Sequence, residues 1–240
     1  MSALPKIKHV LFKEKLPHNG ETVQFRPFTV KEEKILLYAE QDDESSIIDA
    51  IKQIITNCVT TPNFDVNALP MFAVEFLFMR LRAKSVNNII EIMIHDKEDD
   101  RNIPVRVDLD EIKVFTPEGH DPIIKLGDTM GLVMDYPALP HLSGIKTSLA
   151  EAGEDANAID ILFRIMAECI GKIYDGDTVL VRGKDFSTAD AVEFLEGLSS
   201  ANFKKIQAFF DTIPYLYHKI TYQNSKGEQS VELKGLASFF

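Results

Sequence analysis

The chain has 240 residues, a mass of 27.0 kDa and a formal net charge of −11, from 26 basic and 37 acidic residues. Hydrophobic residues make up 45% and charged residues 26%, which suits a globular core and excludes collagen-like, mucin-like and wholly disordered proteins. The excess of acid disfavours binding to DNA or RNA, because phosphate backbones attract basic surfaces. The strongest candidate for a basic patch is Arg80, Arg82 and Lys84, three charges at the end of one expected helix.

The two cysteines, Cys58 and Cys169, each stand inside an apolar helical pattern. This placement favours buried, reduced thiols over a disulfide scaffold. A catalytic thiol is disfavoured, because neither helix brings a histidine near the cysteine. The N-terminus lacks the apolar stretch of a leader peptide, and no run approaches about 18 apolar residues. We therefore expect a protein of the cytoplasm, or of an assembly built there.

The expected elements begin with a hairpin, in which residues 10–15 and 21–28 flank Asn19-Gly20. Asn-Gly supplies the positive φ angles that a tight turn needs. The segment Thr29-Val30-Lys31-Glu32 has the spacing of a capping box and predicts a helix that runs to about residue 40. A second helix is expected over residues 45–58, where isoleucines recur at helical spacing.

A third helix is expected over residues 70–84, with Pro70 in the first turn, where its missing N–H costs nothing. This helix is apolar on nearly all sides, so it is buried in a core or against a partner. Alternating apolar residues then predict two strands around a polar hairpin loop, followed by shorter strands. These strands cover residues 90–94, 103–107, 112–115, 123–126 and 131–135.

The second half follows residues 143–157, whose glycines and serines make them the best candidate for a linker. We expect a helix over residues 156–174, a turn at Asp175-Gly176-Asp177 and a brief strand or extended loop over 178–181. Two short helices and a terminal hairpin complete the chain. They cover residues 187–198, 202–212, 217–222 and 230–233.

The two cysteine-bearing helices match each other without a gap when Cys58 is aligned with Cys169. Either the chain is an internal duplication of helix, linker, helix and hairpin, or two amphipathic helices match by chance. We expect an α+β fold of two pseudo-repeated helical lobes, each ending in a β-hairpin, with additional short strands in the N-terminal half. The lobes would cover residues 1–142 and 158–240, joined by a linker over residues 143–157.

Motifs for chemistry are missing from the sequence. None of the six histidines stands three or four residues from another, and no Cys-x-x-Cys pair occurs, so we expect no metal and no cofactor. No nucleophile elbow and no phosphate-binding glycine loop is present. Two of the 37 acids could still converge for glycoside cleavage, although nothing in the sequence marks such a pair.

Apolar and aromatic surplus is the remaining signal. The helix over residues 70–84 and the aromatic segments near the C-terminus are either plain core or, taken together, a docking face for proteins. The basic turn at the end of that helix either pairs with an acidic partner or is a solvated helix end. The candidate partner-binding residues are Phe76, Arg80, Arg82, Lys84, Phe203, Phe209, Phe210, Tyr215, Phe239 and Phe240.

Several segments, in this order, resemble the baseplate hub assembly proteins of T-even-like contractile-tailed phages, over nearly the whole chain. The first is Phe25-Arg26-Pro27-Phe28-Thr29-Val30-Lys31-Glu32-Glu33-Lys34 with Leu36-Leu37, which resembles the opening of those proteins. The others are Arg80-Leu81-Arg82-Ala83-Lys84-Ser85-Val86 and residues 128–137, 173–177, 203–214 and 236–240.

The resemblance implies a non-enzymatic role in building the phage tail, by binding hub or tape-measure proteins, in the host cytoplasm during assembly or in the tail baseplate of the virion. Relatives often carry Cys-x-x-Cys zinc knuckles on their hairpins. The hairpin loops of this chain, residues 96–102 and 223–228, hold no cysteine, so zinc is not carried over. The alternatives are a tail-associated cell-wall hydrolase and a host adaptor unrelated to phage.

Overall fold

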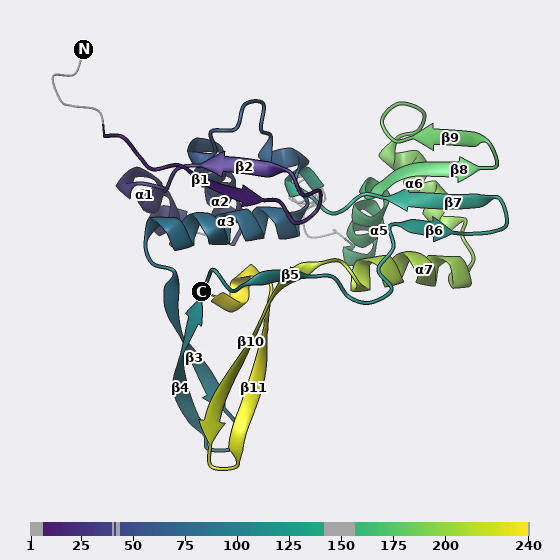
Figure 1. The fold of residues 1–240 in the computed structure, drawn as a ribbon. Helices are drawn as coiled ribbons and strands as arrows, with labels where there is room; N and C mark the ends of the chain where they lie inside the picture. Colours follow the sequence, from purple (N-terminus) through teal and green to yellow (C-terminus); the bar gives the residue numbers. More distant parts are fainter. Residues whose placement is uncertain (1–6, 40, 42–43, 142–156, 240) are drawn as a thin grey trace. The chain divides into compact units, whose positions relative to one another are not determined.

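The structure of the protein is a computed structural model, which describes residues 7–39, 41, 44–141 and 157–239. Helices and small antiparallel sheets alternate along the chain, so the expected α+β class is confirmed (Figure 1). Residues 143–156 of the expected linker, and Phe240 of the expected docking set, lie outside the described residues.

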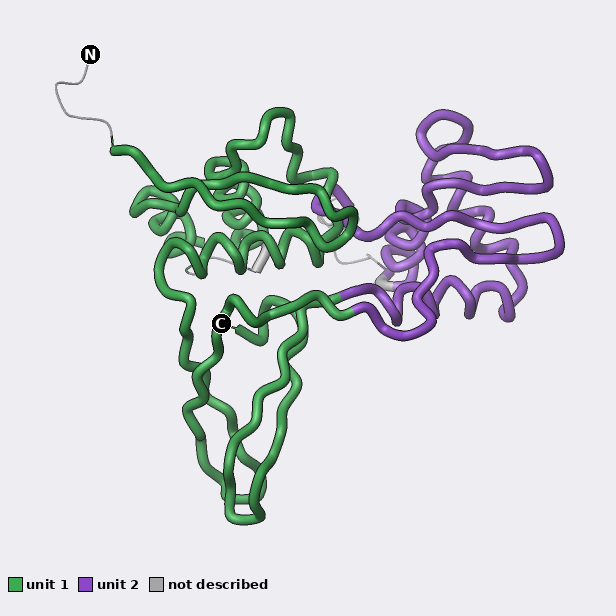
Figure 2. Tube along the Cα trace, in the orientation of Figure 1, with its two compact units in different colours: residues 1–115, 215–240 green, residues 116–214 purple. Residues whose placement is uncertain are grey.

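The chain forms two compact units, residues 1–115 with 215–240 (unit 1) and residues 116–214 (unit 2) (Figure 2). The C-terminal hairpin, which the predicted division assigns to the C-terminal lobe, belongs to the unit of the N-terminal residues. Unit 1 contains β1 (Phe12–Lys15), β2 (Thr22–Phe25), α1 (Val30–Ala39), α2 (Glu44–Cys58), η1 (Val66–Ala68), α3 (Met71–Ser85), β3 (Ile89–Asp96), β4 (Arg101–Asp108), β5 (Lys113–Phe115), β10 (Tyr215–Asn224), β11 (Gly227–Lys234) and η3 (Leu236–Phe239). Unit 2 contains β6 (Ile123–Lys125), β7 (Met130–Met134), α5 (Ala158–Glu168), β8 (Ile170–Asp175), β9 (Thr178–Val181), α6 (Thr188–Glu196) and α7 (Ser200–Asp211).

The first hairpin and the first helix form as their local sequence predicts. Gly20 takes a φ of 73°, and the Glu21 amide donates to the Asn19 side chain at 3.0 Å, so the Asn-Gly turn is confirmed. The Glu32 carboxylate reaches back to the Thr29 amide at 2.9 Å and caps α1. The Thr29 hydroxyl accepts from the Lys31 amide at 3.3 Å, one residue earlier than a full capping box requires.

Two long hairpins, β3–β4 and β10–β11, run side by side in unit 1 (Figure 1). Strand β5 pairs with the start of β10 and closes a three-stranded sheet in the order β11-β10-β5. Apolar side chains from α3, both hairpins and η3 share one core, which includes Phe76, Met79, Val107, Leu216 and Phe239. Helix α3 is buried along most of its length, as a helix apolar on all sides requires.

Unit 2 is a four-stranded antiparallel sheet, in the order β6-β7-β8-β9, with three helices packed against it. Its core joins residues of β6 and β7 to residues of α5, α6 and α7. The fully buried side chains include Leu132, Cys169, Ile170 and Ile206. The sheet has two edge strands, β6 and β9, and the first of these forms part of a site described below.

The prediction of one helix over residues 156–174 is wrong in its second part. Helix α5 ends at Glu168, and residues from Ile170 to Asp175 form β8. The segment pairs with β7 on one side and β9 on the other, and glycine is required at 171 because the Asp135 carboxylate lies 2.6–2.7 Å from the position where a Cβ would stand. The two-residue turn after Asp175, with Gly176 at a φ of 55°, then folds β8 back onto β9.

Candidate functional site

The tips of the two long hairpins of unit 1 are joined by polar side chains. Asp96, at the end of β3, accepts hydrogen bonds from the amides of Glu98 and Asp99 at 3.0 and 2.8 Å. Its other oxygen accepts from the Asn224 side chain at 2.9 Å, from the opposite hairpin. Asp96 is only 1% exposed, so this carboxylate is a buried connection between two loops that are far apart in sequence.

A second carboxylate strengthens the same joint. Asp99 accepts from the Ser225 amide at 3.0 Å and also from the Ser225 hydroxyl. Lys226 forms an ion pair with Glu98 across the two tips. We call this set of contacts, from Asp96, Glu98 and Asp99 to Asn224, Ser225 and Lys226, the hairpin latch.

The hydrogen bonds of the latch hold its acids in the ionised form. The amide of Asp99, followed by the Tyr222 hydroxyl, lowers the pKa of Asp96 to about 2. The Ser225 hydroxyl and amide lower the pKa of Asp99. Both side chains are therefore acceptors at neutral pH, and this arrangement suits a structural joint better than acid catalysis.

Arg80 is the buried charge of α3. Its guanidinium donates to the carbonyl of Leu109 at 2.7 Å and to that of Ile112 at 2.9 Å. The carboxylates of Glu14 and Asp110 lie 3.7 and 3.8 Å from it, and it stands 4.7 Å from the ring centre of Phe76. Arg80 therefore ties the loop after β4 to the helix, using charges of this chain.

The other predicted docking residues of unit 1 lie around this helix. Lys84 pairs with both oxygens of Asp110 at 2.9 Å, and Arg82 is half-buried. Phe239 is 2% exposed and shares the core with Phe76. Tyr215 is half-buried and contacts Phe115, whose ring centre lies 5.7 Å away. A docking role for these residues stays a prediction.

The predicted docking residues of unit 2 come together in or beside its core. Phe209 is 2% exposed and forms a three-ring cluster with His120 and Tyr136, at centroid distances of 5.2 and 5.7 Å, and the other two rings lie 5.6 Å apart. Phe203 stacks on Phe163 at 5.1 Å. Phe210 packs edge-on against Phe209 at 5.2 Å. Most of the aromatic surplus seen in the sequence therefore packs inside the unit.

His120 connects three elements at this cluster. One ring nitrogen lies 2.9 Å from the Thr212 hydroxyl, and the other lies 2.9 Å from the Tyr136 hydroxyl. Burial lowers the pKa of His120, so the ring is neutral at pH 7 and one nitrogen donates while the other accepts.

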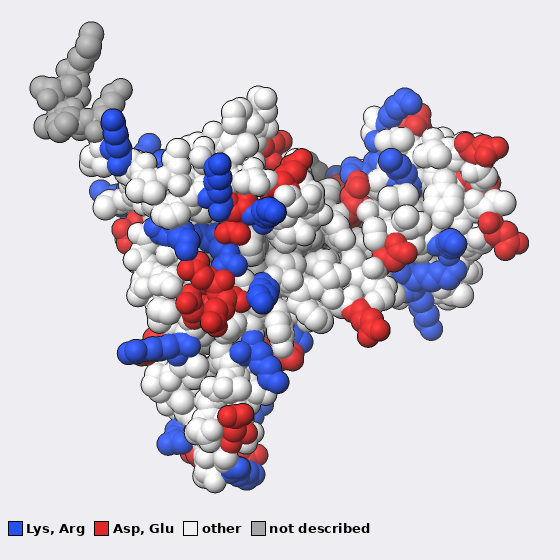
Figure 3. All heavy atoms as spheres, in the orientation of Figure 1, with Lys and Arg blue, Asp and Glu red and all other residues white. Residues whose placement is uncertain are grey.

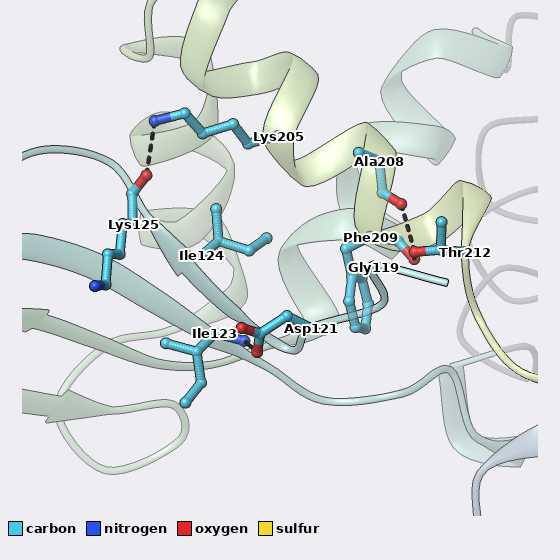
Figure 4. Close-up of a pocket in the computed structure, with 9 residues that line it drawn as sticks. All are labelled: Gly119, Asp121, Ile123, Ile124, Lys125, Lys205, Ala208, Phe209 and Thr212. Atoms are coloured by element: carbon cyan, nitrogen blue, oxygen red, sulfur yellow. Dashed lines mark hydrogen bonds between the residues drawn. The ribbon is translucent and has the colours of Figure 1, made fainter. Parts of the chain in front are cut away.

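A hollow of about 630 Å³ lies between strand β6 and helix α7 in unit 2 (Figure 4). Sequence reasoning missed it, because the strand is short and its helix follows about 75 residues later in the chain. The one local signal is the alternation at β6, where buried Ile124 stands between exposed Ile123 and Lys125. The lining residues are Gly119, Asp121, Ile123, Ile124, Lys125, Lys205, Ala208, Phe209 and Thr212.

Chemistry-bearing groups are few among the described residues. Burial raises the pKa of the Cys58 thiol to about 11 and that of Cys169 to about 12, so both are protonated and inert at neutral pH. Within the described ranges, no group of three or more His, Cys, Asp or Glu residues is placed to hold a metal ion. No helix among them has the length and apolarity to cross a membrane.

On the surface of the described residues, exposed apolar side chains are scattered among charged side chains of both signs. Met93 on β3 is 60% exposed, and Val179 on β9 is 53% exposed. Basic and acidic side chains form small separate groups on the face in Figure 3, with other residues between them. Blue side chains gather over the β6–α7 end of unit 2 in the same view.

One comparison with known proteins gives a match, and that match covers both units. The family model described as T4 bacteriophage base plate protein matches residues 8–240. No curated protein and no solved structure matches the chain.

Proposed function

Because the chain belongs to the T4 bacteriophage base plate protein family, we propose that it is a non-enzymatic baseplate hub assembly factor or hub component. It would act by binding other proteins, and its partners would be hub or tape-measure proteins of the phage. The observation that carries this proposal is the extent of the family match, residues 8–240, which includes every described residue of both units except Ile7.

The geometry of unit 1 supports a binding role over a catalytic one. Three of its charged groups are committed to structural contacts: Arg80 to two carbonyls, and Asp96 and Asp99 to the opposite hairpin. Such contacts give a rigid projection on which exposed side chains such as Met93 keep a fixed position. A rigid surface loses little conformational entropy on binding.

The predicted docking set divides by accessibility. We propose that the members with part of the side chain accessible bind the partner, and that the fully buried members hold the surface in shape. The accessible members are Arg82, Lys84, Phe203, Phe210 and Tyr215. The buried members are Phe76, Arg80, Phe209 and Phe239.

The proposal includes an internal duplication, with two pseudo-repeated lobes. Two equivalent hydrogen bonds support it: the Arg26 amide donates to the Cys58 carbonyl at 3.0 Å, and the Asp135 amide donates to the Cys169 carbonyl at 2.7 Å. In each case the amide of the residue directly after a strand, β2 or β7, donates to the carbonyl of the cysteine at the end of a helical stretch, α2 or α5. A later helix and a long hairpin follow in both halves, α3 with β3–β4 and α7 with β10–β11.

The place of action would be the host cytoplasm during assembly. From there the protein either stays in the tail baseplate of the virion or leaves as a chaperone. Quantitative mass spectrometry on purified virions and on infected-cell lysate separates these two forms of the proposal. A fixed low copy number in virions indicates a hub component, and abundance in the lysate alone indicates a chaperone.

The decisive test is a phage that lacks the gene, examined by electron microscopy of its tail intermediates. We expect baseplates without a closed hub, and restoration of the hub when the chain is supplied from a plasmid. Normal hubs in the deletion phage would overturn the proposal. Turnover of purified peptidoglycan by the isolated protein would instead favour the tail-associated hydrolase.

A further inference from the structure

Strand β6 is an edge strand of the unit 2 sheet, and its outer backbone groups can be identified from the register. The Leu126 amide donates to the Met130 carbonyl at 2.9 Å, and the Met134 amide donates to the Pro122 carbonyl at 2.8 Å. These bonds place Ile124 opposite Leu132 as a hydrogen-bonded pair. The N–H and C=O groups of Ile123 and Lys125 therefore point away from β7.

Two of these four outer backbone groups form hydrogen bonds with side chains of unit 2. The Ile123 amide donates to the Asp121 carboxylate at 2.8 Å, and the Lys125 carbonyl accepts from the Lys205 ammonium at 2.7 Å (Figure 4). The Ile123 carbonyl and the Lys125 amide have no partner among the described residues. One acceptor and one donor thus remain open, on either side of Ile124.

This pair of open groups fits one residue of a parallel strand. In a parallel ladder, a residue faces one residue of the neighbouring strand. Its amide donates to the carbonyl of the residue that precedes that facing residue, and its carbonyl accepts from the amide of the residue that follows it. An incoming residue beside Ile124 would therefore satisfy the Ile123 carbonyl and the Lys125 amide together. An antiparallel strand would also use the Ile123 amide and the Lys125 carbonyl, which Asp121 and Lys205 already occupy.

The opposite edge of the same sheet does not offer this arrangement. The Val181 amide of β9 donates to the Asp185 carboxylate at 2.9 Å. The Val181 carbonyl accepts from the amides of Lys184 and Asp185 at 3.2 and 2.8 Å. The turn after β9 thus occupies both outer groups of Val181, so the amide that a parallel strand beside Leu180 would need is already bonded.

The hollow beside β6 provides a place for a side chain. An incoming residue opposite Ile124 points its side chain to the same face of the sheet as Ile124. On that face lie Ala208 and Phe209 of α7, which line the hollow. Ala208 is exposed and small, so it leaves the space open. The volume of about 630 Å³ is within the range of sites that bind ligands.

The charges around the groove favour a particular residue type directly after the incoming residue that enters the hollow. Lys125, Lys204 and Lys205 are exposed at the end of β6 and on α7, where basic side chains gather in Figure 3. Asp121 lies at the other end of the strand. A parallel segment therefore meets negative charge first and positive charge second, and an acidic residue is favoured directly after the residue in the hollow.

We propose that the β6–α7 groove binds an extended segment of another protein, which adds a strand parallel to β6, places an apolar side chain in the hollow and follows it with Asp or Glu. The inference rests on the proposed function only for the source of the segment, another baseplate protein of the same phage. This mode of recognition combines main-chain hydrogen bonds for affinity with one pocket for specificity.

The test uses the full chain and an array of overlapping short peptides from the other baseplate proteins of the phage. We expect binding peptides to share an apolar residue followed by an acid, and to shift the amide NMR signals of residues 123–125 and 205–212. Ala208→Phe fills the hollow and should weaken binding at least about tenfold, or 1.4 kcal/mol. Ala201→Phe, at another exposed alanine of α7 that does not line the hollow, should bind like the wild type.

A second pair of variants separates the backbone from the charge. Lys125→Pro removes the open amide at a position where an edge strand tolerates proline, and should weaken binding at least about tenfold. Lys125→Thr keeps the amide, removes the charge and should weaken binding only about threefold. Equal effects of the two variants would overturn the strand-addition geometry.

The failures of the two proposals are distinguishable. If no peptide shifts residues 123–125 while the deletion phage lacks hubs, the groove proposal is overturned and the proposed function stands. If light scattering shows a dimer that Ala208→Phe dissociates, the occupant is a second copy of the chain, and the proposal of a partner segment is overturned. Binding at the groove together with normal hubs in the deletion phage supports the groove and overturns the function.

Discussion

The two units of the protein satisfy their buried polar groups in opposite ways. Among the described residues, the three buried charged side chains, Glu32, Arg80 and Asp96, all belong to unit 1. Each of them bonds backbone or side-chain groups that lie elsewhere in the chain or in the next turn. The core of unit 2 is apolar and aromatic, and part-buried polar links beside it run from His120 to Thr212 and Tyr136, from Asn202 to Leu126 and from Arg182 to Ile170.

The difference follows from how each unit is assembled from the chain. Unit 1 brings together segments separated by more than 100 residues, and ionic hydrogen bonds fix their mutual register with directional contacts. Unit 2 is built from a continuous stretch of chain and is held by packing. Its sheet is left with an open edge at β6, and an open edge is where a further strand can add.

The largest effect is expected from Arg80→Met, which removes the buried charge of unit 1. The carbonyls of Leu109 and Ile112 would lose their donor, and the free energy of unfolding should fall by about 3–5 kcal/mol. Urea denaturation checks this value. Arg106→Met is the matched control, because the Arg106 side chain is 82% exposed and should contribute little. A loss no larger than that of the control would show that unit 1 does not depend on this charge.

The counterpart in unit 2 is Phe209→Ala, which removes the ring that packs against both His120 and Tyr136. A cavity in an apolar core should lower the free energy of unfolding by about 3 kcal/mol. Amide hydrogen exchange should locate the loss of protection in residues 116–214. Phe115→Ala, at a ring that is 45% exposed in unit 1, should cost clearly less. Equal losses from both variants would contradict the distinction between the units.

A pH-dependent effect of intermediate size is expected from Glu32→Gln. Burial raises the pKa of Glu32, but hydrogen bonds from Arg26 and Thr29 outweigh it and lower the pKa to about 2. The carboxylate therefore stabilises the fold above the unfolded value of 4.5, and this contribution is lost as the pH falls from 4.5 towards 2. At pH 7 the variant should lose about 2 kcal/mol of unfolding free energy.

Thermal denaturation across the pH range checks the sign of the Glu32 effect. The difference between Glu32→Gln and the wild type should shrink steadily below pH 4.5. Glu33→Gln, on the exposed side of the same helix turn, should show no such trend. A difference that persists at pH 2 would mean that the side-chain shape matters and the charge does not.

Local chemistry made part of the fold predictable. The Asn19-Gly20 turn, the Glu32 cap and the apolar periodicity of α3 each act over a few residues, so the sequence indicates them directly. The end of α5 was not predictable in this way. The segment after Cys169 has helical spacing, but it pairs with β7 and β9 as a strand, and Asp135 lies so close to Gly171 that a larger residue would not fit there.

The contacts that define the sites lie beyond local rules. Arg80 has the position of a surface charge at the end of a helix, but residues 109 and 112 cover it with carbonyls. Asp96 and Asn224 stand in two polar loops, each typical of a solvated turn, yet they bond each other across 128 residues. Such pairs depend on how whole hairpins pack against each other, and no local sequence pattern predicts this packing.

A smaller effect of opposite sign is expected from Glu75→Gln in α3. Burial raises the pKa of Glu75 to about 7, although the Leu236 amide favours the charged form. The folded pKa lies above the unfolded 4.5, so stability falls as the pH rises from 4.5 to 7. Glutamine avoids this cost and should raise the free energy of unfolding by about 1 kcal/mol at pH 8 and by nothing at pH 4. A gain of equal size at both pH values would contradict the assignment to ionisation.

The smallest effect is expected from Ser225→Ala in the hairpin latch. The variant removes the hydroxyl that donates to Asp99 but keeps the Ser225 amide, which donates to the same carboxylate at 3.0 Å. The tips should therefore stay joined and open more often, so amide exchange at residues 223–226 should speed up about two- to fivefold. Asp99→Asn removes the charge from both bonds and should speed up exchange further. Ser230→Ala, at an exposed serine of β11, is the control and should leave the exchange of the tips unchanged. If Ser225→Ala matches that control, the two hairpins are held together by their apolar faces alone, and unit 1 resembles unit 2 more closely than its buried charges indicate.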